Sequence, residues 1–144
     1  MRGRHVFVIG GANSAGQAAV YFSQYAIRVT MLVRGKSLTR SMSHYLIEQI
    51  EALDNVEVRT GAEAVAAEGD GRLQALRIRN ADGSEAREDV DACFVFIGAA
   101  PHTDWLDGTV QRDVHGFICT GPDLLAEGRR PAGWPVDRDP LYVG

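Results

Sequence analysis

One strand–turn–helix segment near the start of the chain constrains the fold more than any other feature. His5–Gly10 (HVFVIG) is a short apolar run ending in glycine, a pattern typical of a buried strand. The turn that follows is small and polar, and small or apolar residues then recur at helical spacing from Ser14 to Tyr25. Asn13 or Ser14 is available as the N-cap of this helix. The segment therefore predicts the opening of a βαβ unit.

The sequence continues this alternation and then breaks it. We expect strands at 27–33 and 56–59, with a helix at 41–53 between them. Three strands without helices follow at 64–68, 73–79 and 86–90, separated by turn-rich sequences, and 92–97 is again an unbroken apolar run. The predicted fold class is therefore α/β: a small Rossmann-like parallel sheet with a three-stranded antiparallel meander as its last crossover. Beyond Gly98 we expect one more strand, Phe117–Cys119.

Composition narrows the class of protein. The chain has 144 residues, the size of one domain, and 24% of them are charged, which is ordinary for a globular protein. No apolar run is long enough to span a membrane, so we expect a cytoplasmic protein without a membrane partner. The net charge of −4 argues against nucleic acid as a partner. Residues 1–47 nevertheless carry six basic side chains and no acidic one, which favours a small anion bound near the glycine-rich turn.

The turn itself resembles a dinucleotide-binding loop. Such a loop needs a glycine for the tight turn, a second where backbone meets the pyrophosphate, and a small third residue for helix packing. Gly10 and Ala15 fill the first and third roles, whereas Ala12 stands at the second and is a departure. We assign Gly10, Gly11, Ala12, Asn13, Ser14 and Ala15 to cofactor binding, with the helix N-terminus facing the phosphates. The alternative is a tight turn that binds nothing.

The end of the second strand selects the cofactor. An acidic residue there would bind the ribose 2′-hydroxyl of NAD, whereas an arginine suits the 2′-phosphate of NADP. The sequence offers Arg34, Lys36 and Arg40 and no acid nearby, so we predict NADPH. A solvated basic loop is the alternative. A P-loop is excluded because Thr30 stands where its first glycine belongs, and the missing acid disfavours S-adenosylmethionine.

No catalytic constellation emerges from the remaining polar residues. None of the four histidines has a cysteine or a carboxylate at ligand spacing, so we assign neither a catalytic nor a metal site. Ser14 lacks the glycine spacing of a nucleophile elbow. Cys93 lies in an apolar run and is expected in the core. Trp105 and Trp134 are either interface anchors or loop packing.

Taken together, three motifs resemble the NADPH-binding domain of the thioredoxin reductase family, which are FAD-dependent pyridine nucleotide-disulfide oxidoreductases. The resemblance covers residues 4–120. The family's NADPH loop, G-G-G-N-[ST]-A, is matched except at Ala12, and its I-G-x-x-P-x-T signature is intact at Ile97, Gly98, Pro101 and Thr103. In its 2′-phosphate motif, H-R-R-x-x-x-R, Arg34 matches the first arginine. The other positions depart from the motif, since Val33 replaces the histidine, Gly35 the second arginine, and Thr39 or the adjacent Arg40 the last.

The resemblance implies a function for residues 1–112 as an NAD(P)H-binding domain that positions NADPH for hydride transfer to flavin, with Ile97 and Gly98 added to its cofactor-binding residues. It implies that residues 113–144 return toward an FAD domain outside this chain, and it allows a homodimer of the full-length parent. The parent is then an NADPH-dependent flavoprotein oxidoreductase, and this chain alone is expected to bind nucleotide without turnover. Disulfide reduction is not implied, because the redox CxxC of the family would precede His5. The alternative, from another class, is a non-catalytic nucleotide-sensing or scaffold domain, in which Ala12 weakens binding.

Overall fold

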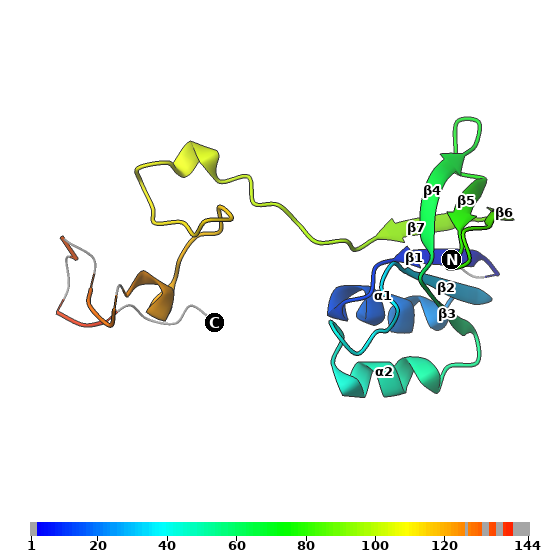
Figure 1. The fold of residues 1–144 in the computed structure, drawn as a ribbon, viewed down its shortest axis with the longest axis horizontal. Helices are drawn as coiled ribbons and strands as arrows, with labels where there is room; N and C mark the ends of the chain where they lie inside the picture. Colours follow the sequence, from blue (N-terminus) through cyan, green and yellow to red (C-terminus); the bar gives the residue numbers. More distant parts are fainter. Residues whose placement is uncertain (1–2, 126, 131–132, 135–136, 140–144) are drawn as a thin grey trace. The chain divides into compact units, whose positions relative to one another are not determined.

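The computed structural model describes residues 3–125, 127–130, 133–134 and 137–139. Its contacts divide the chain into two compact units, Met1–Ile97 and Gly98–Gly144, each of which is described by itself. The first unit contains every helix and strand of the predicted α/β fold (Figure 1). The division falls before residue 112, where the sequence suggests that the cofactor-binding domain ends.

A four-stranded parallel sheet is the framework of the first unit. Its strands β1 (His5–Ile9), β2 (Arg28–Val33), β3 (Val56–Thr60) and β7 (Ala92–Val95) lie in the order β3-β2-β1-β7. All neighbouring pairs are parallel, as the unbroken apolar runs predict. The chain leaves β1 toward β2 on one side and reaches β7 on the other, so the connections diverge between β1 and β7.

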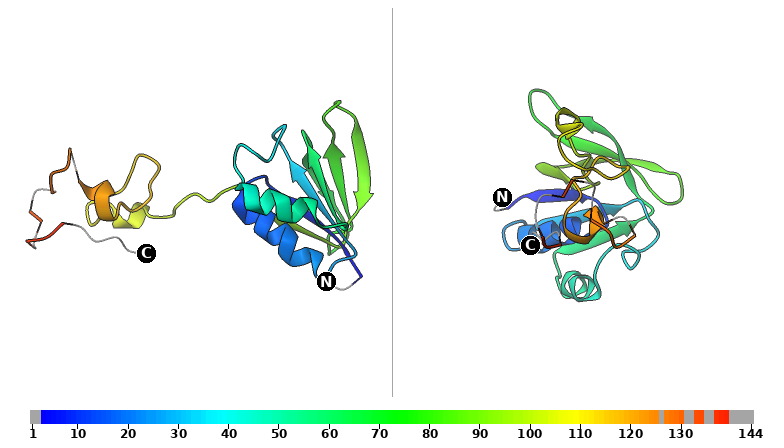
Figure 2. Two further views of the ribbon diagram at one scale, coloured as in Figure 1. Left: turned by 90° about the horizontal axis from the view of Figure 1, so that it is seen from below. Right: turned by 90° about the vertical axis from the view of Figure 1, so that its left-hand side faces the viewer.

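Helices cover one face of this sheet. Both α1 (Asn13–Ser23) and α2 (His44–Glu51) lie on the same side, as Figure 2 shows. Alternate strand residues point toward them, and the resulting core is fully buried at Val6, Val8, Val29 and Met31. Leu46 and Ile50 close it from α2.

An antiparallel meander covers the opposite face. Strands β4 (Glu63–Glu68), β5 (Ala75–Arg79) and β6 (Glu85–Asp89) pair in the order β4-β5-β6 and connect β3 to β7. Phe7 and Leu32 on the parallel sheet pack with Leu76, Ile78 and Val90 in a second core. Half-buried Cys93 packs against this second core. The predicted fold class, including the meander as last crossover, is confirmed.

Two predictions differ from the structure by more than two residues, whereas the other element ends agree to within two residues. The second helix begins at His44, not at residue 41. Two of the three residues before it, Ser41 and Ser43, are hydrogen-bonded to Gly11 and Asn13. Phe117–Cys119 does not form a strand; only Ile118 pairs, in an isolated bridge with Arg112. Among the residues that the structure describes, no helix has the length and apolar character needed to cross a bilayer.

Candidate functional site

The turn after β1 brings three strand ends together at Gly10. Its φ of +146° lies in the region that favours glycine, and its N–H donates to the Leu32 carbonyl at 3.0 Å. A Cβ at this position would collide with the carbonyl oxygen of Phe96 and approach the Ala15 Cβ to 3.0 Å. A side chain at residue 10 would therefore separate β1 from the end of β7.

Gly11 and Ala15 pack the turn against the sheet and helix α1. Gly11 faces Val33, the last residue of β2, leaving no room for a side chain. Ala15 is fully buried in the first core, which agrees with its predicted role as the small packing residue. The turn is thus fixed on both sides by contacts that only small residues allow.

The N-cap of helix α1 lies before both of the predicted caps, Asn13 and Ser14. Ala12 is the N-cap, with extended backbone (φ −102°, ψ 179°) that any residue can adopt. The expectation that Asn13 or Ser14 caps the helix is wrong, because both lie inside its first turn and no side chain caps it. The first turn contains no acidic residue, and Ala12, Asn13 and Ser14 are exposed. The positive end of α1 is therefore open to an anion.

Asn13 instead holds a distant segment. Its Oδ1 accepts hydrogen bonds from the Ser43 backbone N–H at 2.8 Å and from the Ser43 hydroxyl at 3.2 Å. The Ser41 hydroxyl donates to the Gly11 carbonyl oxygen at 2.8 Å. No local sequence signal identified these contacts, because the partners are about thirty residues apart. They join the loop after β2 to the turn after β1.

The loop after β2 carries the predicted basic side chains. Arg34, Lys36 and Arg40 are all exposed, and within the described part of the chain none of them forms an ion pair or a hydrogen bond. The backbone around them is ordered by local bonds, since the Ser37 hydroxyl accepts from the Thr39 N–H at 3.1 Å. Three positive charges are therefore held beside the turn without internal partners.

Ile97 follows β7 at the end of the first unit, and Gly98 is the first residue of the second unit. The Phe96 N–H donates to the Ile9 carbonyl at 2.7 Å, which carries the β1–β7 pairing beyond Val95. Ile97 is 76% exposed, although it is a large apolar residue. Gly98 is exposed and has a positive φ of +101°.

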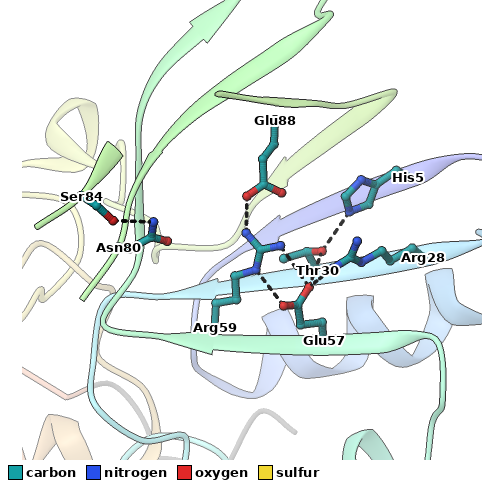
Figure 3. Close-up of polar contacts among 8 residues, drawn as sticks. All are labelled: His5, Arg28, Thr30, Glu57, Arg59, Asn80, Ser84 and Glu88. Carbon is teal, nitrogen blue, oxygen red and sulfur yellow. Dashed lines mark hydrogen bonds and ion pairs between the residues drawn. The ribbon is translucent and has the colours of Figure 1, made fainter. Parts of the chain in front are cut away.

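A polar network that the sequence did not predict lies on the meander side of the sheet (Figure 3). Arg59 on β3 pairs with Glu57 on its own strand and with Glu88 on β6, so the pairs join the parallel sheet to the meander. Burial and the Arg28 charge lower the pKa of His5, whose Nε2 lies 2.9 Å from the Thr30 hydroxyl. The Arg59 hydrogen bonds lower the pKa of Glu57 against the opposing effect of burial.

This network lies near a surface hollow at the other end of the strands. Arg4, His5, Arg72 and Asp91 are among the residues that line the hollow. His5 begins β1 and Asp91 precedes β7, so the hollow opens at the amino ends of these parallel strands. Ligands of such sheets bind at the carboxyl ends, and we therefore place the candidate site at the glycine turn.

Comparison with known proteins gives one family and several related enzymes. A family model described as pyridine nucleotide-disulphide oxidoreductase matches residues 1–124. The thioredoxin reductase of Borreliella burgdorferi is 32% identical over 120 residues, which are 83% of this chain and 36% of that protein. A protein named NADH dehydrogenase from Ferdinandcohnia aciditolerans is 34% identical over 117 residues, 81% of this chain and 22% of its own length.

A solved structure agrees with these matches. The crystal structure of T. acidophilum thioredoxin reductase superposes with a TM-score of 0.73 at 26% identity. The match covers 82% of this chain and 39% of that one. The chain thus spans well under half the length of the relatives it matches.

Proposed function

Because the chain belongs to the pyridine nucleotide-disulphide oxidoreductase family, we propose that it is the NADPH-binding part of a thioredoxin reductase-like flavoprotein oxidoreductase. At the level of the domain its fold is that of the thioredoxin reductases. The proposal assigns nucleotide binding to the turn after β1 and the loop after β2. It assigns FAD, and a homodimer if one forms, to the full-length parent.

The turn after β1 suits a pyrophosphate. Gly10 and Gly11 keep side chains away from the strand ends, and the uncapped first turn of α1 offers the N–H groups of Asn13, Ser14 and Ala15. Backbone N–H groups at a helix N-terminus bind phosphate well, because the helix dipole adds positive potential there. The extended backbone of Ala12 can be adopted by any residue, so this departure from the family motif keeps the path of the chain and adds only a methyl group.

The loop after β2 suits a 2′-phosphate. Arg34 follows the last residue of β2, the position from which a side chain reaches the adenosine ribose. Its guanidinium has no described partner and can form two charge-assisted bonds to a phosphate, with Lys36 and Arg40 adding positive charge. This unpaired basic group is the single observation that carries the choice of NADPH, since the relatives include both a thioredoxin reductase and an NADH dehydrogenase.

The remaining part of the site would border the nicotinamide. Ile97 and Gly98 follow β7, beside the point between β1 and β7 where the connections diverge and where such sheets bind dinucleotides. When bound, reduced nicotinamide would supply a hydride, which in the proposed parent would be taken up by FAD. The residues of this chain bind and orient the cofactor, and no described residue is assigned a chemical step.

Titration calorimetry of the chain with NADPH, NADH and FAD tests the proposal. We expect one NADPH site, NADH binding weaker by about tenfold or more, and no FAD binding, because the sequence offers a single dinucleotide-type glycine loop, Gly10–Ala15. A yellow preparation that retains FAD would contradict the domain assignment. Absence of NADPH binding would favour a scaffold domain instead.

A further inference from the structure

Three consecutive residues dock the loop after β2 onto the turn after β1. The Ser41 hydroxyl donates to the Gly11 carbonyl at 2.8 Å, and the Ser43 N–H and hydroxyl both donate to Asn13 Oδ1. Between them, buried Met42 packs against α1 so closely that a Cβ on Gly16 would lie 2.9 Å from the Met42 sulfur. Each residue of this Ser41–Ser43 clamp therefore contacts the turn or the first part of α1.

The clamp directly follows the basic side chains. Arg40 is the residue before Ser41, and the segment back to Arg34 contains only one buried side chain, Leu38. The Gly35 carbonyl accepts from the Gly61 N–H at 2.9 Å, which anchors the other end of the segment. The Ser41–Ser43 clamp thus fixes the carboxyl end of the basic segment, residues 34–40, next to the turn after β1.

The clamp between the two loops matters for NADPH because this cofactor carries two separate anionic groups. Its 2′-phosphate and its pyrophosphate are attached to the same adenosine ribose, so the separation of the two anionic groups varies little. A protein gains most from both groups when its two anion sites are already held at a matching separation, because no ordering cost is then paid on binding. NADH has no 2′-phosphate, so it gains nothing from the position of the basic segment.

We propose that Ser41 and Ser43 are positioning residues for nucleotide specificity: they hold the basic segment at the separation from the glycine turn that NADPH requires. This inference rests on the proposed function. It concerns the ratio of NADPH to NADH affinity, and it assigns neither serine a contact with the cofactor.

The test compares dissociation constants of the full chain and the Ser41→Ala/Ser43→Ala variant for both nucleotides at fixed salt. We expect NADPH to bind about three- to tenfold more weakly and NADH to change by less than about twofold, the scale of one or two lost hydrogen bonds. Among single variants at residue 41, Ser41→Ala should lower the ratio of NADPH to NADH affinity. Ser41→Thr keeps the hydroxyl and should leave that ratio at the wild-type value. Ser23→Ala is the matched control, because that hydroxyl donates at 2.7 Å to Val20 within α1.

A double-mutant cycle distinguishes positioning from general stability. In a chain that already carries Arg34→Ala, Lys36→Ala and Arg40→Ala, the serine substitutions should no longer weaken NADPH binding. Equal losses for both nucleotides, or an additive cycle, would overturn the inference while the wild-type preference for NADPH still supports the proposed function. A wild-type chain without that preference would overturn both. If the double variant does not fold, Ser41→Ala alone is compared with Ser41→Thr.

Discussion

A Cβ atom on residue 11 would lie 2.8 Å from Cγ1 of Val33, so the glycine turn and the last residue of β2 are packed without a gap. Val33 is buried, and its β-branched side chain has little rotamer freedom with which to move away. We expect Gly11→Ala to reduce the free energy of unfolding by about 1–3 kcal/mol, the usual cost of overpacking. Urea unfolding measures the change.

A second substitution at the contact between Gly11 and Val33 provides a control for this prediction. Val33→Ala vacates the space that the new methyl group needs, so the double variant should lose less stability than the sum of the single variants. Gly35→Ala should be nearly neutral, because its Cβ would lie in ordinary contact, 3.6 Å from the backbone oxygen of Ser37. Strict additivity of Gly11→Ala and Val33→Ala would contradict the packing argument.

Ala12→Gly tests the departure from the family's loop. If the pyrophosphate approaches the N-terminus of α1, removing this methyl group should tighten NADPH binding by about 0.5–1.5 kcal/mol, offset in part by the flexibility of glycine. Fluorescence titration of NADPH measures the affinity. Unchanged or weaker binding would mean that the phosphates do not pass Ala12.

The proposed preference for NADPH over NADH depends on Arg34. Arg34→Ala should weaken NADPH binding about tenfold or more and NADH only slightly, because the lost charge-assisted bonds reach only the 2′-phosphate. Arg34→Asp should reverse the preference, since a carboxylate repels the phosphate and accepts a bond from a ribose hydroxyl. The measured quantity is the ratio of the two dissociation constants at fixed salt.

Arg72→Ala is the matched control for this series. Arg72 is also exposed and has no described ion pair, but it lines the hollow at the amino ends of the strands. Its removal changes the net charge by the same amount and should leave the ratio unchanged. If Arg34→Ala reduces the affinity for NADPH and for NADH equally, Arg34 is a solvated loop residue that does not select the nucleotide.

Arg59 connects the two sheets of the first unit. Arg59→Ala leaves Glu57 and Glu88 without their shared cation, and Glu88 is only 25% exposed. We expect a loss of about 1–3 kcal/mol in the free energy of unfolding. The control is Arg77→Ala, whose pair with Glu85 is long and exposed and should contribute less than about 0.5 kcal/mol. Similar losses for both variants would show that the network adds nothing to the packing.

His5 makes stability depend on pH. Its pKa in the folded chain is lowered by burial first and by the Arg28 charge second, so the folded state disfavours the protonated imidazole. The unfolded chain binds the proton more readily, so this contribution is complete above about pH 6.5 and is lost as pH falls through the lowered pKa. His5→Gln should flatten the pH dependence of the urea midpoint in that range. An unchanged pH profile would contradict the assignment to His5.

The helices and strands were predicted well from local patterns, because the tendency of a segment to form a helix or a strand depends mainly on its own residues. The apolar runs at β1, β2 and β7 and the turn-rich sequences between β4, β5 and β6 are sufficient to predict both sheets. The helix cap was predicted wrongly for a different reason. Asn13 has the side chain of a good cap, but its oxygen is bound to Ser43, a partner that local sequence does not reveal.

The candidate site, too, was predicted only where local sequence carries the information. Its glycines and basic residues were assigned from the sequence, and whether they bind a nucleotide stays a prediction. The serines that join the two loops were missed, as was the network around Arg59, because both depend on how distant strands align. Thr30 and Glu57 are neighbours only through the register of β2 and β3.

The meander between β3 and β7 has a consequence for the order in which the chain can fold. Val6 pairs with Ala92, so the β1–β7 ladder closes a loop that contains the whole first unit, and such closures are slow. During synthesis, β1 and β2 can pair early, whereas Phe96, whose carbonyl lies beside Gly10, leaves the ribosome after every strand of the first unit. The candidate site is therefore completed only after nearly all of the first unit has been translated, and a ribosome-stalled chain ending before β7 would lack the backbone of Phe96 against which Gly10 packs.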